Sequence, residues 1–380
     1  MKVVLDQRHQ CRPAHIGLLL LIVLLSACSI NGSASRSMVS QTMTTHCTQI
    51  GVLLPDTASS DRWQAKDRPL LTAAINQALP DAKVDVVNAE GNAATQQNQA
   101  EQAMTRGDCM LVVAAVDSDQ ASAIVSSAFR QNVPVIAYDR LIQNKHLKYY
   151  VSFDNMRVGV LQGQYIATHL QQYASNKPIN LVMINGAETD NNALLFKQGA
   201  MSQLNPLISS HKINKVYDIF VPDWDNDRAR TSMEQALTAN QNNIQIAYVA
   251  NDGMANAVIA ALRAQKLDGR VLVTGQDATI AGIQNILLGN QSMTIYKAIT
   301  KEADATAQLV AAISNNQDTS ALTQGHTTKT QDGTTIPSVL ETPIIVTKET
   351  IKETVINDHY IDKTQICQNL PVTLNTQGIC

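Results

Sequence analysis

The chain has 380 residues, of which 44% are hydrophobic and 16% are charged, and its formal net charge is −3. This length and composition are those of a globular protein large enough for two domains, and they exclude a disordered chain. A mildly acidic balance gives no electrostatic footprint for nucleic acid, so no nucleic-acid partner is expected.

Residues 1–27 have the features of a lipoprotein signal peptide. Lys2, Arg8 and Arg12 form a basic start, and the apolar run that follows at 16–25 is too short to span a bilayer. The run ends in Leu-Ser-Ala-Cys, which resembles a bacterial lipobox with Cys28 as the lipidated residue. The alternative is an ordinary signal peptide with an incidental cysteine. The chain beyond residue 27 has 26 basic and 31 acidic residues, a net charge of −5, and we expect it to reach a membrane only through its lipid.

Beyond the leader, a Ser- and Thr-rich tether at 28–46 is followed by alternating strand and helix patterns. We predict a first set of strands at 50–54, 83–88, 109–114, 135–138 and 149–153, and a second at 180–185, 213–221, 246–250, 270–274 and 293–296. The helices predicted between them span 63–79, 94–106, 118–131, 155–172, 191–204, 225–240, 254–265 and 278–288, and a helix at 301–314 returns to the first set. A hairpin that turns at Asp332 and Gly333 is expected within 327–346.

This alternation predicts an α/β fold with parallel sheets covered by helices on both faces. The two sets predict two doubly wound lobes joined by a hinge of three chain segments. We expect the lobes and the tail to be divided as follows: an N-terminal lobe of 47–153 plus 298–336, a C-terminal lobe of 154–297 plus 337–366, and a C-terminal tail of 367–380.

Four cysteines remain beyond Cys28, namely Cys47, Cys109, Cys367 and Cys380. Export implies an oxidising compartment, in which two disulfides are expected. Cys47 and Cys109 each precede an apolar strand and are able to bridge neighbouring strands, with free buried thiols as the alternative. Cys367 and Cys380 would close a short C-terminal loop. No Cys or His spacing is typical of a metal site, and we expect neither a metal nor a cofactor.

Polar and aromatic side chains follow nearly every predicted strand. Because ligands of open parallel sheets bind beyond the carboxyl ends of the strands, these side chains are candidate ligand contacts. They are Arg62 and Trp63, Asp139 and Arg140, Asp190 to Asn192, Asp223 and Trp224, Asn251 and Asp252, Gln276 and Asp277, and Lys297. Carboxylates and amides accept from hydroxyls, Arg and Lys donate, and indole faces pack on the C–H faces of a sugar ring, so the set suits a neutral polyol. Each residue alone also has a structural explanation, because Asp and Asn cap helices and Trp is often core.

Catalytic interpretations have less support. A glycosidase pair of Asp139 and Asp277 is conceivable, but each site carboxylate has a donor neighbour and no His stands among the candidates. No Gly-x-Ser-x-Gly elbow and no phosphate-binding glycine loop is present. The Asp-x-Asp-x-Asp run at 223–227 imitates a calcium loop, but Arg228 stands where the sharp turn requires Gly. This run is instead predicted to begin a helix.

Taken in order, these residues resemble the type I periplasmic sugar-binding proteins of ABC transporters, most closely those that bind D-xylose. The resemblance covers about residues 50–361. Its matching segments are Arg-Trp-Gln at 62–64, Lys-Asp-Arg at 66–68, Ala-Tyr-Asp-Arg at 137–140, Ser-Phe-Asp-Asn at 152–155, Asp-Asn-Asn-Ala at 190–193, Ala-Leu-Thr-Ala-Asn at 236–240, Asn-Asp at 251–252, Gly-Gln-Asp-Ala at 275–278 and Met-Thr-Ile-Tyr-Lys at 293–297.

The resemblance implies a ligand set in which both lobes contact the sugar and the two Trp residues enclose its ring. The first lobe would contribute Arg62, Trp63, Asp139 and Arg140, and the second Asn192, Trp224, Asn251 and Asp277, with Lys297 near a crossing and Asp190 in support. The match around Trp224 is loose, and the lipobox, tether and tail depart from a freely diffusing binding protein.

The resemblance also implies hinge closure on a monosaccharide and delivery of it to a membrane permease by a monomer that is not an enzyme. The alternative is a periplasmic sugar sensor whose closed form signals to a chemoreceptor or histidine kinase. A ligand-binding repressor is disfavoured, because a leader stands where a helix-turn-helix would be.

Overall fold

The computed structural model describes residues 46–173, 179–376 and 378–380. The expected signal peptide, the expected lipidation site Cys28 and nearly all of the expected tether lie outside these residues. Within the described part of the chain, no helix has both the length and the apolar character needed to cross a membrane.

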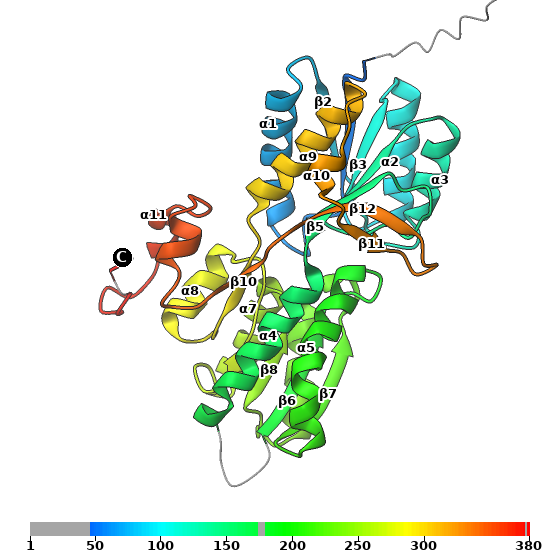
Figure 1. The fold of residues 1–380 in the computed structure, drawn as a ribbon. Coiled ribbons are helices and arrows are strands. Elements are labelled where there is room, and N and C mark those ends of the chain that lie inside the picture. The colour runs from blue at the N-terminus through cyan, green and yellow to red at the C-terminus, as the bar shows by residue number, and fades with distance from the viewer. Residues whose placement is uncertain (1–45, 174–178, 377) are drawn as a thin grey trace, which may run out of the picture. The chain divides into compact units, whose positions relative to one another are not determined.

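The N-terminal lobe is built on a seven-stranded sheet in the order β11-β12-β5-β4-β3-β1-β2 (Figure 1). Its strands are β1 (Gln49–Leu54), β2 (Lys83–Asn88), β3 (Met110–Val113), β4 (Val135–Tyr138), β5 (Tyr149–Phe153), β11 (Thr327–Lys329) and β12 (Thr335–Glu341). Neighbouring strands are parallel except β11, which forms the predicted hairpin with β12.

Helices cover both faces of this sheet. They are η1 (Trp63–Asp67), a π-helical turn, α1 (Arg68–Ala78), α2 (Ala93–Arg106), α3 (Ser122–Arg130), α9 (Ile299–Ser314) and α10 (Ser320–Thr323). Because side chains alternate along a strand, Val52 of β1 packs in one cluster with Leu71 of α1 and Val310 of α9, whereas Leu53 packs with α2 and α3. The β-strand period therefore produces two separate cores, one on each face.

The C-terminal lobe is built on a four-stranded parallel sheet in the order β7-β6-β8-β9. Its strands are β6 (Ile179–Asn185), β7 (Ile213–Phe220), β8 (Ile246–Val249) and β9 (Leu272–Val273). Its helices are α4 (Asn155–His169), η2 (Leu170–Tyr173), α5 (Asn191–Ser209), η3 (Pro222–Trp224), α6 (Asn226–Ala239), α7 (Asp252–Ala264) and α8 (Ile280–Leu288). The predicted class of two doubly wound α/β lobes is confirmed.

The chain passes between the lobes three times, from β5 to α4, from β10 (Thr294–Tyr296) to α9, and from β12 to β13 (Ile344–Val346). The boundary expected after residue 336 cuts through β12, which pairs with β5 as far as Glu341. The third crossing is therefore at 342–343, later than expected. β10 was expected to extend the second parallel set, but it pairs antiparallel with β13 in a two-stranded sheet of its own.

Two further details concern the ends of elements. The helix predicted at 118–131 was expected to begin at Ser118, but α3 begins only at Ser122. Ser118 instead contacts the other lobe, where its N–H donates to the Thr189 carbonyl at 2.9 Å. Asp225 caps α6 by accepting from the Arg228 N–H, so the acidic run at 223–227 begins a helix as predicted.

Both predicted disulfides are present, Cys47–Cys109 and Cys367–Cys380. The first joins the segments that lead into the neighbouring strands β1 and β3. The second closes the tail after η4 (Lys352–Ile356) and α11 (Lys363–Cys367). The tail shares an apolar cluster with α8, and the Gln284 side chain of α8 donates to its backbone carbonyls.

Candidate functional site

A cavity lies between the two lobes, at the carboxyl ends of their parallel strands. It holds about 320 Å³ of space between atoms, part of it open to solvent. The strand orders place β1 between β2 and β3, and β6 between β7 and β8, so each sheet has a point where successive connections leave in opposite directions. Ligands of doubly wound sheets bind at such points.

Asp139 and Arg140 follow β4 directly, and β5 fixes their backbone. Asp139 has a φ of 59°, in the left-handed region that residues other than glycine rarely adopt. Its N–H donates to the Val151 carbonyl at 2.8 Å, and its carbonyl accepts from the hydroxyls of Ser152 at 2.7 Å and Tyr150 at 3.0 Å. These bonds stabilise a conformation that costs free energy by itself.

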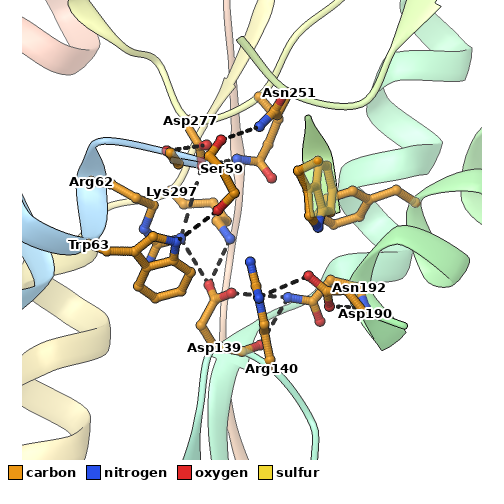
Figure 2. Close-up of a pocket in the computed structure, with 14 residues that line it drawn as sticks. Ser59, Arg62, Trp63, Asp139, Arg140, Asp190, Asn192, Asn251, Asp277 and Lys297 are labelled. Carbon is orange, nitrogen blue, oxygen red and sulfur yellow. Dashed lines mark hydrogen bonds and ion pairs between the residues drawn. The ribbon is translucent and has the colours of Figure 1, made fainter. Parts of the chain in front are cut away.

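The Asp139 carboxylate is contacted from both lobes. Its Oδ2 accepts from Arg62 Nη1 at 2.9 Å and from Lys297 Nζ at 2.8 Å, and its Oδ1 accepts from Asn192 Nδ2 at 3.1 Å (Figure 2). Burial alone would raise the pKa of Asp139, but the charges of Lys297 and Arg62 outweigh burial and hold the pKa below its ordinary value. Asp139 is therefore a carboxylate at neutral pH.

Arg140 forms a second charged contact between the lobes. Its Nε lies 2.9 Å from Asp190 Oδ2, and its Nη1 donates to the Ala115 carbonyl at 3.0 Å. The other Asp190 oxygen accepts from the Asn192 backbone N–H at 2.9 Å and caps α5. Burial raises the pKa of Asp190, although the Arg140 charge acts in the opposite direction.

Asn251 is both a helix cap and part of the cavity wall. Its Oδ1 accepts from the Met254 N–H at 3.0 Å and begins α7. Its Nδ2 donates to the Ser59 carbonyl of the other lobe at 3.2 Å. Asn251 is therefore both a helix cap and a site residue, because its amide oxygen caps α7 while its amide NH₂ group donates to the other lobe.

Asp277 stands on a strained turn between β9 and α8. Its φ is 103°, and that of Ala278 is 49°. The turn is fixed from behind by the buried carboxylate of Asp252, which accepts from the Thr279 N–H at 2.8 Å and from the Thr294 hydroxyl at 2.8 Å.

The Asp277 side chain reaches the opposite lobe. Its Oδ2 accepts from the Ser60 hydroxyl at 3.0 Å, and its Oδ1 lies 4.0 Å from Arg62 Nη1. Burial raises the pKa of Asp277, with the charges of Lys297 and Arg62 opposing that rise. Asp277 is thus less strongly ionised than Asp139.

Two indoles line the cavity. The Trp63 ring centroid lies 4.5 Å from the guanidinium carbon of Arg62 and 5.2 Å from that of Arg140, so two cations stack on its faces. Trp224 packs edge-to-face on Phe196, with ring centroids 6.4 Å apart, and its buried Nε1 has no hydrogen-bond partner among the described residues. Both indoles also belong to the apolar cores of their lobes, so the core and site interpretations are compatible.

The sequence matches the family model described as the periplasmic binding protein domain over residues 50–318, which is more than half of the chain. The chain belongs to the periplasmic binding protein family. It is similar to proteins named D-xylose-binding periplasmic protein in Haemophilus influenzae, with 39% identity over 320 residues, and in Escherichia coli, with 38% identity over 318 residues. Each alignment covers 84% of this chain and 92% of the relative.

A solved structure shares the fold of this periplasmic binding protein. It is an ABC transporter solute-binding protein from Clostridium phytofermentans with bound β-D-glucose, with a TM-score of 0.73 and 28% sequence identity, and the match covers 84% of this chain and 100% of that one. The predicted family is confirmed. The prediction of a binding protein rather than an enzyme is confirmed with it, since the family consists of binding proteins.

The structure brings all ten predicted site residues of the periplasmic binding protein to one cavity: Arg62, Trp63, Asp139, Arg140, Asp190, Asn192, Trp224, Asn251, Asp277 and Lys297. The lining also includes residues that the sequence prediction left out of its ligand set: Ser59, Ser60, Phe196 and Gln276. Gln276 was already a strand-end candidate, although the resemblance did not place it in the ligand set. The two serines lie in the loop between β1 and η1, so a wider window at the end of β1 would have found them. Phe196 lies four residues after Asn192 on α5, and only helical spacing indicates it.

The chemistry of this lining is that of recognition through hydrogen bonds. Carboxylates, amides, two guanidiniums and an ammonium face one space, and all can exchange hydrogen bonds with hydroxyl groups. The part of the chain that the structure describes contains no group of three or more His, Cys, Asp or Glu side chains placed to bind a metal ion.

Proposed function

We propose that this chain is the sugar-binding component of an ABC importer, anchored in the periplasm through lipid on Cys28. It closes on one monosaccharide, D-xylose in the first instance, between its two lobes. The closed form then delivers the sugar to a membrane permease. The residues of the proposed ligand set are the ten predicted ones, all of which line the cavity.

The observation that carries this proposal is the charge balance of the cavity. Asp139 is paired with Arg62 and Lys297, and Arg140 is paired with Asp190. Cations and carboxylates are thus compensated by one another, which suits a ligand without charge of its own. Such a lining still offers many charge-assisted donors and acceptors to hydroxyl groups, and these are stronger than bonds between neutral groups.

The choice of D-xylose rests on similarity. The two relatives with 38% and 39% identity are named for that sugar, and they align along most of this chain. A buried site also discriminates between epimers, because a hydroxyl in the wrong place leaves desolvated protein groups unpaired.

Calorimetric titration tests the proposal. The chain from residue 29 onward is produced without the lipidation site, unfolded and refolded with its disulfides oxidised to remove carried sugar, and titrated with D-xylose, D-glucose, D-ribose and D-galactose. We expect one-to-one binding that is tightest for D-xylose. Absence of binding by every sugar would reject a monosaccharide function, and tighter binding of another sugar would replace D-xylose.

Arg140→Ala tests the site. The expected loss of D-xylose affinity is on the order of 100-fold, because truncating one partner of a buried charge pair costs about 2–5 kcal/mol. Arg263→Ala is the matched control, since Arg263 forms an exposed ion pair with Asp268 on the surface. Equal affinities of the two variants would show that Arg140 is not part of the sugar site.

The anchor is tested separately in cells with the full chain. Labelled palmitate should be incorporated into the wild-type chain and not into Cys28→Ala, which should also leave the membrane fraction. Growth on limiting D-xylose distinguishes import from the sensory alternative, because deletion of the gene would impair uptake in the first case and only the transcriptional or chemotactic response in the second.

A further inference from the structure

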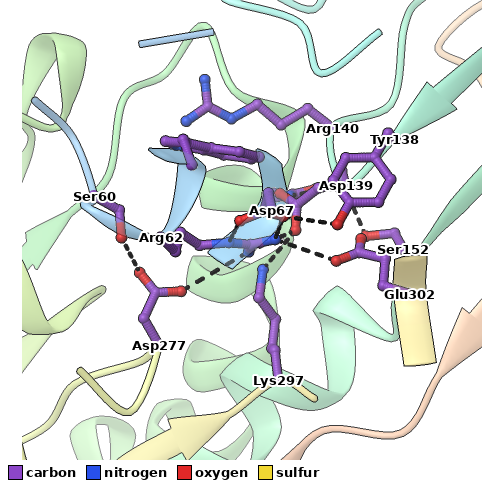
Figure 3. A network of polar contacts seen from close by, with 12 residues as sticks. Ser60, Arg62, Asp67, Tyr138, Asp139, Arg140, Ser152, Asp277, Lys297 and Glu302 are labelled. Carbon is purple, nitrogen blue, oxygen red and sulfur yellow. Dashed lines mark hydrogen bonds and ion pairs between the residues drawn. The ribbon is translucent and has the colours of Figure 1, made fainter. Parts of the chain in front are cut away.

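Arg62 contacts the cavity with only one edge of its guanidinium group. The opposite edge is bound by Asp67, whose Oδ2 accepts from Nε at 2.9 Å and whose Oδ1 accepts from Nη2 at 2.7 Å (Figure 3). This is the two-bond geometry in which Arg and carboxylate interact most strongly. Asp67 is fully buried and does not line the cavity.

The backbone of η1 makes this pair possible. In an α-helix a residue five positions on is about 1.4 turns away and points to another face. Residues Trp63–Asp67 instead form a π-helical turn, in which the Arg68 N–H donates to the Trp63 carbonyl five residues back. The wider turn returns position 67 to the side of position 62. Single π-turns of this kind occur frequently at functional sites.

Two more buried side chains complete the enclosure. The Tyr138 hydroxyl donates to Asp67 Oδ1 at 2.7 Å, and Glu302 Oε2 accepts from Arg62 Nη2 at 3.2 Å. Tyr138 ends β4 and Glu302 lies in the first turn of α9, so three separate segments of the N-terminal lobe meet behind Arg62. Figure 3 shows them on the side of Arg62 opposite Asp277.

A count of donors shows what this arrangement leaves for a ligand. A guanidinium has five N–H groups in a rigid fork. Three of them, on Nε and Nη2, are taken by Asp67 and Glu302, and one on Nη1 is taken by Asp139. The other N–H on Nη1 is left for the cavity, where Asp277 Oδ1 lies 4.0 Å from Nη1, beyond hydrogen-bond distance. Its direction is set by Asp139 and by Asp67 and Glu302, and the last two do not line the cavity.

We propose that Asp67, Tyr138 and Glu302 are positioning residues that aim this single Arg62 donor at one oxygen of the bound sugar. The inference rests on the proposed sugar-binding function, and it adds residues outside the cavity to the determinants of affinity and selectivity. Electrostatics agree with the geometry. Burial opposes the charge on Arg62, but Asp67 and Asp139 outweigh it and raise the pKa of the guanidinium well above its ordinary value.

The test compares Asp67→Asn with wild type in two ways. In calorimetry with D-xylose, we expect affinity to fall about 10-fold or more, because the hydrogen bonds that fix the guanidinium group lose the charge of their acceptor. Preference for D-xylose over D-ribose should narrow as well, since a freely rotating fork discriminates less. Tyr138→Phe, which removes only one hydroxyl, should act in the same direction by about threefold. Asp218→Asn is the control, because Asp218 is ion-paired to Lys197 and Lys215 away from the cavity.

A double-mutant cycle separates positioning from general damage. In an Arg62→Lys background there is no fork to orient, so Asp67→Asn should change D-xylose affinity by less than about twofold. The full effect of Asp67→Asn persisting in that background would overturn the proposal, and so would wild-type affinity in Asp67→Asn. If Asp67→Asn does not fold, Tyr138→Phe and Glu302→Gln are each combined with Arg62→Lys in the same kind of cycle, and the same outcomes support or overturn the proposal.

A second readout needs no sugar. In ¹⁵N-arginine spectra of the sugar-free protein, the Arg62 Nε–H signal should be sharp and slow to exchange with solvent, and Asp67→Asn should remove that protection. A protein that binds no sugar but shows this protection fails the proposed function and keeps the positioning role. An Arg62 signal that exchanges rapidly in wild type rejects the positioning role whatever the titration gives.

Discussion

The two lobes position their halves of the cavity by different means. In the N-terminal lobe, Arg62 and Asp139 are fixed by each other and by buried charged side chains, of which Asp67 lies five residues after Arg62 and Glu302 lies 240 residues away from it. In the C-terminal lobe, Asp190 and Asn251 are fixed by backbone N–H groups only two or three residues further along, because each caps the helix that follows its strand.

This difference predicts different responses to mutation. A helix cap contributes about 1 kcal/mol and acts alone, so the C-terminal half should lose function one residue at a time. A cluster of buried charges requires every partner, because removing one leaves an uncompensated charge in the interior. The N-terminal half should therefore fail as a unit.

Asp139→Asn should produce the largest effect and tests this contrast most directly. An amide has one oxygen, so its NH₂ group must face either the cations Arg62 and Lys297 or the donor Asn192. We expect a loss of about 3–5 kcal/mol in the free energy of unfolding, as for other broken buried pairs, together with a loss of D-xylose affinity of 100-fold or more. Urea unfolding and calorimetry measure the two.

Asp218→Asn is again the matched control, since it removes a half-buried carboxylate that is paired with two lysines outside the cavity. It should reduce stability less and leave sugar affinity unchanged. A loss of stability in Asp139→Asn no larger than in this control would show that the N-terminal half is not a unit.

The same contrast explains what the sequence made predictable. The C-terminal half follows a local rule, in which a strand is followed by an Asp or Asn that begins a helix, and Asp190 and Asn251 were recognised from it. Asp139, Arg140, Arg62 and Trp63 were also found because they lie close behind strands. The alternation of strands and helices was sufficient for the fold class.

The supporting residues of the N-terminal half were not predictable in this way. Asp67 lies inside a helical pattern, and only the π-turn brings it to Arg62. No local sequence pattern predicted that turn. Glu302 is 240 residues away from Arg62 in the chain and meets it only after α9 has returned to the first lobe. The third crossing was placed too early for a similar reason, because the end of β12 is set by its pairing with β5.

Asp252 in the C-terminal lobe is intermediate between the buried charge cluster and the helix caps, because it is a buried carboxyl whose hydrogen-bond donors are all uncharged. Its oxygens accept from Thr279, Gln291 and Thr294, yet burial dominates and raises its pKa to about 7 from an ordinary value of 3.8. Between pH 3.8 and about pH 7, Asp252 is protonated in the folded protein and ionised in the unfolded chain. The free energy of unfolding is therefore highest below about pH 4, and this contribution is lost as the pH rises through 7.

The prediction concerns the difference between wild type and Asp252→Asn. The variant lacks this titration, so the stability of wild type relative to the variant should fall by up to a few kcal/mol between pH 4.5 and pH 8. Urea unfolding at steps of pH measures it, and using the difference cancels the other carboxyls. A difference that stays constant across this range would mean that Asp252 is already ionised at its lower end.

Asn251 should give the smallest effect and separates capping from binding within one residue. Asn251→Ala removes the cap of α7 and the amide donor to Ser59, whereas Asn251→Ser keeps a capping oxygen and removes only the donor. We expect the alanine variant to lose about 1 kcal/mol of stability and the serine variant a few tenths of a kcal/mol, with both losing D-xylose affinity equally, by about 2- to 10-fold. Asn92→Ala is the control, because Asn92 caps α2 outside the cavity and should lose stability without losing affinity. If serine restored affinity as well as stability, the cap alone would account for Asn251, and the C-terminal half would position its ligands without a direct bond between the lobes.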